Sequence, residues 1–413
     1  MMRALKTYFK NVKEKYKPKN HVTYYLLGAL TVLFAVLSLT GGLKMSDQLL
    51  LEQIGCYIIF AVSLSLVVGF LGELSLGHAG FICLGAYAGT LFRNRFAVGL
   101  TSSAPLVSLV LAMLCGGLLA ALAGFLIGLP ALRLKGDYLA IVTLAFGEIV
   151  KTLFTNLPFF GGPLGLASRR YNRSELFIII FVAAILTVAI VNNFIKSKHG
   201  RAVTAIRDNE IAARAMGVNV TFYKLAVFVL SSFLAGAGGA AYSASLTQVT
   251  AEQFNYNYSI NILVMVVLGS MGSINGSIIA AAAVTLINVQ LKTALPGNLA
   301  AVKDIVYALI LIALVIFNNA PKLRSFREKY NLRRLGDKLC AKIRKIFRRP
   351  VPAPDPAAEL PEPTVWSNIP TKVPMEAILS TDFAPDSATD EAAPDKPDKP
   401  NKPEKHDNAE AKQ

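Results

Sequence analysis

Charged residues and cysteines are both scarce in this 413-residue chain. Lys, Arg, Asp and Glu together make up 16% of the residues, whereas hydrophobic residues make up 54%. Soluble domains carry about 25% charged residues, so the composition argues against a water-soluble protein. Of the four cysteines, Cys56, Cys83 and Cys115 lie in apolar runs and Cys340 lies in a basic stretch. Their spacing fits neither a disulfide framework nor a metal site, so we expect no metal ligands.

A nucleotide-binding loop is missing as well. The glycine-rich stretch LAGAGG at 234–239 lacks the G-x-x-x-x-G-K-S/T arrangement that cradles phosphates, and no such motif occurs elsewhere. We therefore expect that the chain has no catalytic residues, holds no cofactor and is not an enzyme. The net charge of +16 does not indicate nucleic-acid binding, because the positive residues gather in flanks and loops beside apolar runs.

Long apolar runs, by contrast, recur up to Phe317 and none follows Ser325. A membrane-spanning helix needs about 20 mainly apolar residues. The sequence therefore predicts an all-α, polytopic integral membrane helix bundle with about eight to ten spans. The predicted spans are Tyr24–Thr40, Leu49–Phe70, Leu76–Phe92, Ala104–Leu129, Tyr138–Leu157, Leu176–Ile195, Phe222–Leu246, Ile260–Gly269, Ile278–Leu291 and Val302–Phe317.

The run Ile260–Gly269 is too short to cross a membrane by itself. Ten residues of helix extend about 15 Å, and the hydrocarbon core is about 30 Å thick. The glycine-rich break LGSMGSINGS joins this run to Ile278–Leu291. Either both pieces cross, giving ten spans, or they form a re-entrant hairpin, giving eight.

The distribution of Lys and Arg predicts the orientation. Segments 1–21, 129–137, 196–224 and 322–349 hold 27 of the 42 basic residues. Alternating crossings put all four on one side, which must be the cytoplasm. We expect a multi-pass protein of the bacterial cell (inner) membrane with both termini in the cytoplasm.

Four regions follow from this pattern. Residues 1–21 form a basic cytoplasmic N-terminus, residues 22–318 the transmembrane domain and residues 319–349 a basic amphipathic segment. Apolar residues of that segment recur at helical spacing, which suits either anionic membrane lipid or packing on the cytoplasmic face. Residues 350–413 contain 13 of the 20 prolines and many Asp and Lys residues, which predicts a disordered cytoplasmic tail.

The segment RAVTAIRDNEIAARAMG at 201–217 is a charged, alanine-rich stretch between two apolar runs. We expect it to lie in water, since a polar helix between two spans cannot face lipid. Small residues from Ala202 to Met216 fall on one helical stripe, and Gly217 ends the helix. Alternatively, Asp208 caps a second short helix that starts near Asn209. The stripe docks either on a soluble partner or on the chain's own membrane domain.

Small residues also recur within the spans. Gly85–Gly89 and Gly124–Gly128 are G-x-x-x-G pairs, and Gly236–Ala240 has the same spacing. Such pairs let helices approach closely. They indicate either helix packing within one chain or a seam between two membrane subunits.

Five stretches together resemble the permease subunits of branched-chain amino acid ABC importers, the leucine-isoleucine-valine systems. They are LSLGHAGFICLGAYAG (74–89), LPALRLKGDYLAIVTLAFGEIV (129–150), GGPLGL (161–166), the stretch 200–242 and MVVLGSMGSINGS (265–277). The resemblance implies that residues 22–318 are a permease domain that forms the translocation path. It further implies a second related permease subunit, two cytoplasmic ATPase subunits and an extracytoplasmic substrate-binding protein.

In such importers a cytoplasmic coupling helix binds the ATPase and carries Glu-Ala-Ala, three residues and Gly. Ala212, Ala213 and Gly217 match that spacing, whereas the Glu is displaced to Glu210. The resemblance therefore supports the role of the loop, but not an exact list of contacts. The candidate coupling residues are Arg201, Arg207, Asp208, Glu210, Ala212, Ala213 and Gly217.

A transit site for an amino acid should offer helix N-termini to the carboxylate of the cargo. It should offer backbone carbonyls, or a carboxylate group, to the ammonium of the cargo. Broken helices provide such groups. Glycine clusters at 77–80 and 269–276 mark two candidate breaks, and the ionisable pair Glu73 and His78 flanks the first. For Glu73 and His78 a capping and packing role is the alternative; for Glu148 and Lys151 a structural ion pair is favoured over a proton relay. The candidate residues of the translocation path are Glu73, Gly77, His78, Gly80, Gly269, Gly272 and Gly276.

Three other functions remain open at this point. The same machinery could carry urea or another small amide, because no residue distinguishes leucine from urea. The chain could be an ion-coupled secondary amino acid carrier, although few acidic residues lie in the spans. It could also be a membrane-anchored scaffold that recruits partners through its tail.

Overall fold

The structure, a computed structural model, describes residues 45–96, 105–134, 136–168, 173–294, 305–309 and 312. The predicted span Tyr24–Thr40, most of Val302–Phe317, the basic segments at 1–21 and 319–349 and the tail at 350–413 lie outside the described residues. Their predictions stay predictions.

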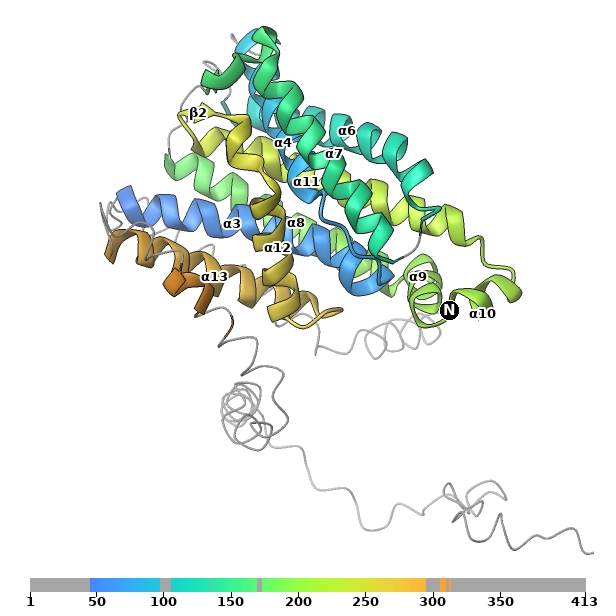
Figure 1. The fold of residues 1–413 in the computed structure, drawn as a ribbon. Helices are drawn as coiled ribbons and strands as arrows, with labels where there is room; N and C mark the ends of the chain where they lie inside the picture. The colour runs from blue at the N-terminus through green and yellow to red at the C-terminus, as the bar shows by residue number, and fades with distance from the viewer. Residues whose placement is uncertain are drawn as a thin grey trace, which may run out of the picture. The chain divides into compact units, whose positions relative to one another are not determined.

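The described residues are almost entirely helical, which confirms the all-α fold (Figure 1). Two strands of two residues each, β1 (Leu166–Ala167) and β2 (Gln248–Val249), pair antiparallel. The longer helices are α3 (Met45–Ser65), α4 (His78–Leu91), α6 (Pro105–Ala131), α7 (Asp137–Asn156), α8 (Arg173–Lys196), α9 (Lys198–Asp208), α11 (Val220–Ser245), α12 (Tyr256–Leu268) and α13 (Ile274–Ala294). The shorter elements are η2 (Leu66–Leu71), η3 (Phe92–Phe96), η4 (Pro158–Phe160), η5 (Gly162–Leu164), α10 (Glu210–Ala215) and η6 (Ala251–Phe254).

Within the described ranges, six helices are long and apolar enough to cross a membrane: Ser46–Leu71, Pro105–Ala131, Asp137–Asn156, Leu176–Lys196, Val220–Ser245 and Ile274–Leu291. Each coincides with a predicted span. Two further predicted spans, Leu76–Phe92 and Ile260–Gly269, correspond to α4 and α12. The 14 residues of α4 continue without a break into η3, which ends at Phe96. The 13 residues of α12 extend about 20 Å, so α12 cannot cross the hydrocarbon core alone.

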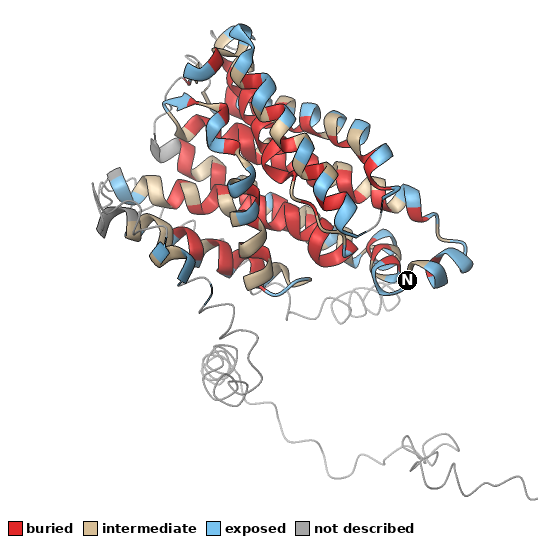
Figure 2. Ribbon diagram, in the orientation of Figure 1, coloured by how far each residue is buried: buried red, intermediate tan, exposed pale blue. Residues whose placement is uncertain are grey.

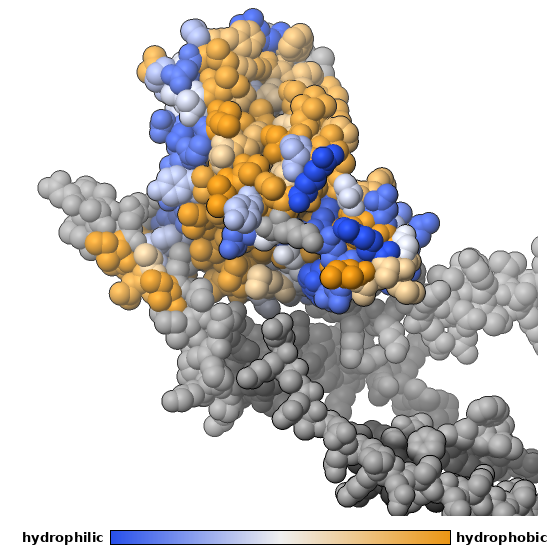
Figure 3. All heavy atoms as spheres, turned by 45° about the vertical axis from the view of Figure 1, so that its right-hand side comes forward, coloured by the Kyte–Doolittle hydropathy of each residue, from blue (hydrophilic) through white to orange (hydrophobic). Residues whose placement is uncertain are grey.

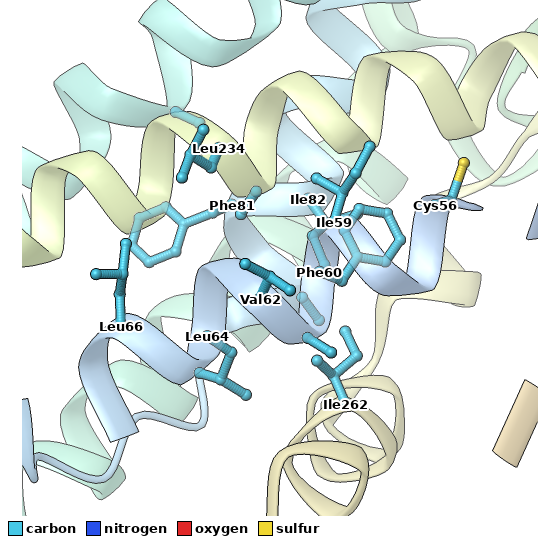
Figure 4. Packing of buried hydrophobic residues seen from close by; sticks show 14 of the residues in the cluster. Cys56, Ile59, Phe60, Val62, Leu64, Leu66, Phe81, Ile82, Leu234 and Ile262 are labelled. Carbon is cyan, nitrogen blue, oxygen red and sulfur yellow. The ribbon is translucent and has the colours of Figure 1, made fainter. Parts of the chain in front are cut away.

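The core lies where α11 packs against α3, α4 and α6 (Figure 2). Almost the whole of α3 is buried, and its Ile59, Phe60 and Val62 pack toward α4 and α11 (Figure 4). Glycines allow the close approach of α4 and α11: a Cβ on Gly85 would collide with the backbone of Gly236. These small residues therefore pack helices of the same chain against each other. This was one of the two predicted roles, the other being a seam between two membrane subunits.

The outer face of α6 is uniformly apolar. Its exposed residues include Leu114, Leu118, Leu122 and Leu126, and no charged residue occurs between Pro105 and Ala131. Figure 3 shows broad hydrophobic surface on the molecule, with hydrophilic residues gathered at its lower right and along its left edge. Such an apolar face suits contact with lipid, where there is no water to solvate a charge.

The break between α12 and α13 is a tight turn at 269–273. Gly272 has a φ of +83°, a conformation that glycine adopts without strain. The turn lies beside η2, because a Cβ on Gly69 would be 2.6 Å from the Gly272 nitrogen. The turn therefore lies at the end of the bundle that η2 occupies. The helix that follows the turn, α13, has 21 residues. Whether α12 and α13 both cross the membrane or form a re-entrant hairpin stays a prediction, since α12 is too short to cross the hydrocarbon core alone.

Candidate functional site

The segment between α8 and α11 folds as two helices rather than one. Ser197 caps α9, and Asn209, with φ −158° and ψ 105°, breaks the helix and caps α10 by accepting a 3.0 Å hydrogen bond from the Ala212 nitrogen. The alternative with a second helix is thus the one observed, but its cap is Asn209. Asp208 instead pairs with Arg207 at 2.9 Å.

Burial in this segment departs from the predicted single stripe, because the break at Asn209 changes the direction of the chain. Ile206 and Ala213 from the stripe are buried. Met216, also from the stripe, is 84% exposed, and Ile211 is 81% exposed. Gly217 has a φ of +81° and ends the segment, as predicted from its position. The result is a short helix, α10, with two large exposed apolar side chains: Ile211 within the helix and Met216 directly after it.

A buried cluster of charges joins α10 to the membrane-spanning helices. The ammonium of Lys224, in the first turns of α11, donates to Glu73 Oε1 at 2.5 Å and to Glu210 Oε2 at 3.2 Å. The Lys224 side chain is 6% exposed and that of Glu73 is 12% exposed. Arg214 adds an outer ion pair to Glu210 at 2.9 Å. Lys224 thus links α10 to the loop between η2 and α4, where Glu73 lies.

Arg207 of α9 makes a second connection. Its Nη1 donates to the carbonyl of Gly69 in η2 at 3.2 Å. A Cβ on Gly72 would lie 2.7 Å from the Arg207 Cγ, and one on Gly272 would lie 3.5 Å from its Nη1. The side chain therefore lies where η2, the loop after η2 and the turn between α12 and α13 meet. We call the residues Gly69, Gly72, Glu73, Arg207, Glu210, Lys224 and Gly272 the junction.

The remaining residues of the first predicted break are packed inside the bundle. A Cβ on Gly77 would collide with the Thr143 carbonyl of α7, and one on Gly80 would lie 2.9 Å from the Gly147 Cα. His78 is buried and shares a 2.8 Å hydrogen bond with Ser63 of α3. The start of α4 is thus held by α3 and α7, and also by α12 through a 2.9 Å bond from the Ala79 nitrogen to Ser259.

Gly269 and Gly276 pack directly on each other, so that a Cβ on either would collide with the backbone of the other. Their role in the structure is to close the turn between α12 and α13. The structure therefore brings Glu73 and Gly272 to the junction with Arg207 and Glu210. It does not gather Gly77, His78 and Gly80 there, because they lie deeper in the bundle. Arg201 and Asp208 are exposed on α9.

Sequence reasoning named neither Lys224 nor Gly69 as a site residue. A signal for Lys224 existed: it is a lysine at the third residue of the predicted span Phe222–Leu246, where burial of the charge requires a partner. Gly69 carried no signal, since it lies in an apolar run and its role depends on a turn about 200 residues later in the chain.

Comparisons with known proteins agree with this architecture. Residues 48–315 match the family described as the permease component of branched-chain amino acid transport systems. The high-affinity branched-chain amino acid transport system permease protein LivM of Salmonella typhimurium is 37% identical over 54% of this chain and 59% of its own length. The LivM protein of Escherichia coli is 36% identical over the same shares.

One more distant relative has a different name. The guanosine ABC transporter permease protein NupQ of Bacillus subtilis is 26% identical over 42% of this chain and 60% of its own length. This chain spans less than two thirds of the length of the two LivM proteins named above. No solved structure matches it. Because the family match covers most of the chain, including every helix described here from α4 to α13, the protein belongs to the family of branched-chain amino acid transport permeases.

Proposed function

We propose that this chain is the membrane-spanning permease subunit of an ATP-driven ABC importer for branched-chain amino acids. The observation that carries the proposal is the junction: a helix with exposed apolar side chains, α10, is tied by buried Lys224 to the loop between η2 and α4. A force applied to α10 from outside the membrane would reach the membrane-spanning helices through this bridge. An ATPase subunit that docks on α10 would supply that force.

The exposed side chains of α10 support docking on a protein. Ile211 and Met216 expose large apolar surfaces next to Ala212 and Ala215, which are exposed as well. An amphipathic helix of this kind suits a hydrophobic groove. The residues Arg201, Arg207, Asp208, Glu210, Ala212, Ala213 and Gly217 are then the coupling segment, with Arg207 and Glu210 directed toward the chain's own helices.

The charges of the junction support a rigid link over a loose one. Removing one partner of a buried ion pair costs about 3–5 kcal/mol, because an uncompensated charge is left behind. Lys224 is bonded to two carboxylates on different elements. Movement of α10 away from α11 would have to break these bonds, so α10, the Glu73 loop and the start of α11 should move together.

The proposal includes partners that the family membership favours. They are a second related permease subunit, two cytoplasmic ATPase subunits and an extracytoplasmic substrate-binding protein, assembled in a bacterial inner membrane with α9 and α10 on the cytoplasmic side. ATP hydrolysis belongs to the partners. Branched-chain amino acids are favoured as cargo because the LivM proteins are more similar to this chain than the guanosine permease is.

The test is uptake by the whole complex in proteoliposomes. We expect labelled leucine to accumulate only when ATP is present on the side of α10, and unlabelled isoleucine and valine to compete. Competition by urea or guanosine alone would contradict the proposed cargo. Accumulation that requires an ion gradient and ignores ATP would contradict the proposed energy source and support a secondary carrier.

A further inference from the structure

The end of the bundle away from α10 is formed by the short connecting elements η3, η4, η5, β1 and β2. The helix α11 begins shortly after α10 and runs for 26 residues to Ser245, just before β2. It extends about 39 Å, more than a hydrocarbon core about 30 Å thick. Figure 1 accordingly shows β2 and α10 far apart. With α10 in the cytoplasm, as proposed above, these connections lie on the extracytoplasmic side of the membrane.

These connections are fastened to one another. Asn94 of η3 donates a 2.8 Å hydrogen bond to the Ala167 carbonyl of β1, and β1 pairs with β2. The fully buried Arg93 donates from its Nη2 to Ser168 Oγ at 2.9 Å and to Ser243 Oγ of α11 at 3.2 Å. The connections therefore form a braced surface that is tied to α11. We call this surface the platform: residues 92–96, 158–168 and 248–249.

Large apolar side chains are exposed on the platform. Phe96 of η3 is 82% exposed, Leu164 of η5 is 77% exposed and Phe159 of η4 is 58% exposed. The helix before η4, α7, has 20 residues and extends about 30 Å, which is the full thickness of the hydrocarbon core. The segment from η4 to β1 therefore lies at or beyond the edge of the hydrocarbon. Apolar side chains that gather on such a surface mark a site of interaction.

The residue types of the platform favour a protein over lipid headgroups as its partner. The Arg95 guanidinium lies 5.3 Å from the centre of the Phe159 ring, a cation–π contact that joins η3 to η4. Arginine and aromatic residues are enriched in protein interfaces. Trp and Tyr, the aromatic residues enriched at lipid headgroups, are absent from the sequence of the platform.

The charge of these connections has one sign. Residues 92–104 and 157–173 contain no Asp or Glu, and Arg95 is exposed. The connection after β1 adds three arginines: Arg169, Arg170 and Arg173. On the neighbouring α7, the acidic Glu148 already has a partner, because it pairs with Lys151 at 2.6 Å. Arginines on this side run against the usual retention of Lys and Arg in the cytoplasm, which points to a use for them in attracting an acidic partner.

We propose that the platform is a docking surface for an acidic face of a soluble extracytoplasmic protein. Its arginines attract carboxylates of that protein, and Phe96, Phe159 and Leu164 pack against apolar side chains beside them. Aromatic anchors and arginines of this kind dominate the affinity of protein interfaces. The proposal rests on the proposed function and deepens it, because the substrate-binding protein of the importer is the partner on this side of the membrane.

Opposite charges placed at one exposed position test the chemistry of the partner. The assembled complex in phosphatidylcholine nanodiscs is titrated with the purified substrate-binding protein of the importer. We expect Leu164→Asp to raise the dissociation constant at least tenfold, whereas Leu164→Lys should leave it equal or lower it. The difference should shrink at high salt, because salt screens exposed charges. Equal dissociation constants for the two variants would overturn the acidic partner.

Arg95→Glu is a second variant, and Arg133→Glu is its matched control. Arg133 is exposed in the turn after α6, on the side of α10, so the same change of charge occurs away from the platform. We expect Arg95→Glu to weaken binding at least tenfold and Arg133→Glu to leave it unchanged. Thermal unfolding of each complex shows whether the fold is intact. Normal binding by a folded Arg95→Glu, or an equal loss in Arg133→Glu, would contradict docking at the platform.

The two proposals fail in different ways. If uptake is ATP-driven and requires the binding protein, but Leu164→Asp and Leu164→Lys bind it alike, the platform is wrong and the proposed function stands. Less phosphatidylglycerol co-purifying from bacterial membranes with Leu164→Asp than with Leu164→Lys would then identify anionic lipid as the occupant. If uptake needs no extracytoplasmic protein, the partner assigned under the proposed function is wrong, and the docking surface falls with it.

Discussion

At the scale of single residues, Lys224 has the most consequential environment in the described part of the chain. It is a nearly buried cation that contacts two carboxylates, Glu73 and Glu210, from two other elements. A buried ion pair contributes little net stability compared with a hydrophobic packing. Its value here is positional, because it fixes α10 against the loop between η2 and α4.

Replacing this cation tests that role. Lys224→Met removes the counter-charge of the largely buried Glu73 carboxylate and one cationic partner of Glu210, which keeps its ion pair with Arg214. We therefore expect ATP-driven leucine uptake to fall at least tenfold. Lys224→Arg should retain much of the activity, and Lys198→Met, on the exposed surface of α9, should retain nearly all of it. Uptake and ATP hydrolysis are measured together in proteoliposomes. Normal uptake by Lys224→Met would refute the link.

A double substitution tests whether the side chains of Glu73 and Lys224 interact. In Glu73→Gln combined with Lys224→Met, the carboxylate charge that Lys224→Met leaves unpaired at Glu73 is gone. The double variant should therefore lose less thermal stability than the sum of the single variants. An interaction energy of about 0.5–3 kcal/mol is typical of residues in one network. Additive losses in thermal unfolding of the complex would mean that the two residues do not interact.

At the scale of elements, the fold depends on close contacts between helices that glycine makes possible. A Cβ on Gly85 would collide with the Gly236 backbone, whereas the nearest atom to a Cβ on Gly147 is 3.7 Å away. In the interior of a helix, both glycines otherwise have the same conformational cost. The pair therefore isolates the effect of close packing between α4 and α11.

We expect Gly85→Ala to destabilise the protein by about 1–3 kcal/mol through overpacking, and Gly147→Ala to be neutral or slightly stabilising. Thermal unfolding of the purified protein in detergent measures both. Equal midpoints for the two variants would show that α4 and α11 can move apart without cost.

The exposed side chains of α10 make a prediction about assembly. Burying an aliphatic side chain of this size contributes about 1.5–3 kcal/mol. Ile211→Asp should therefore weaken binding of the ATPase subunits about tenfold to a hundredfold and reduce stimulated ATP hydrolysis, whereas Ile211→Leu should change little. Co-purification and binding titration measure the effect. Full binding by the Asp variant would place the docking surface elsewhere.

At the scale of the whole molecule, the distribution of basic residues predicts the orientation. A reporter active only in the cytoplasm should be active when fused after Arg349 or inserted at Asp208, and inactive when inserted near Pro158, in the connection after α7. The reason is that Lys and Arg flanks are retained in the cytoplasm. Activity at Pro158 and not at Asp208 would invert the topology and remove α10 from the ATPase side.

Much of the fold could be predicted from the sequence, because apolar runs of about 20 residues form helices in a membrane whatever their neighbours. The spans corresponding to α3, α6, α7, α8 and α11 coincide with observed helices. The polar segment between α8 and α11 could also be located, since a polar stretch between two spans must lie outside the membrane. The predicted cap of its second helix, Asp208, was one residue too early, because Asp and Asn both cap helices well and the observed cap is Asn209.

The sequence by itself determined the class of the protein and its membrane-spanning helices, and it predicted a polar segment between two spans for docking of a soluble partner, because these follow from local hydrophobicity and charge. Only the tertiary structure decided that Lys224 joins Glu73 to Glu210 and that Arg207 reaches Gly69 and Gly272. These contacts join residues that are up to 151 positions apart. Their proximity results from the packing of whole helices, which no local pattern encodes.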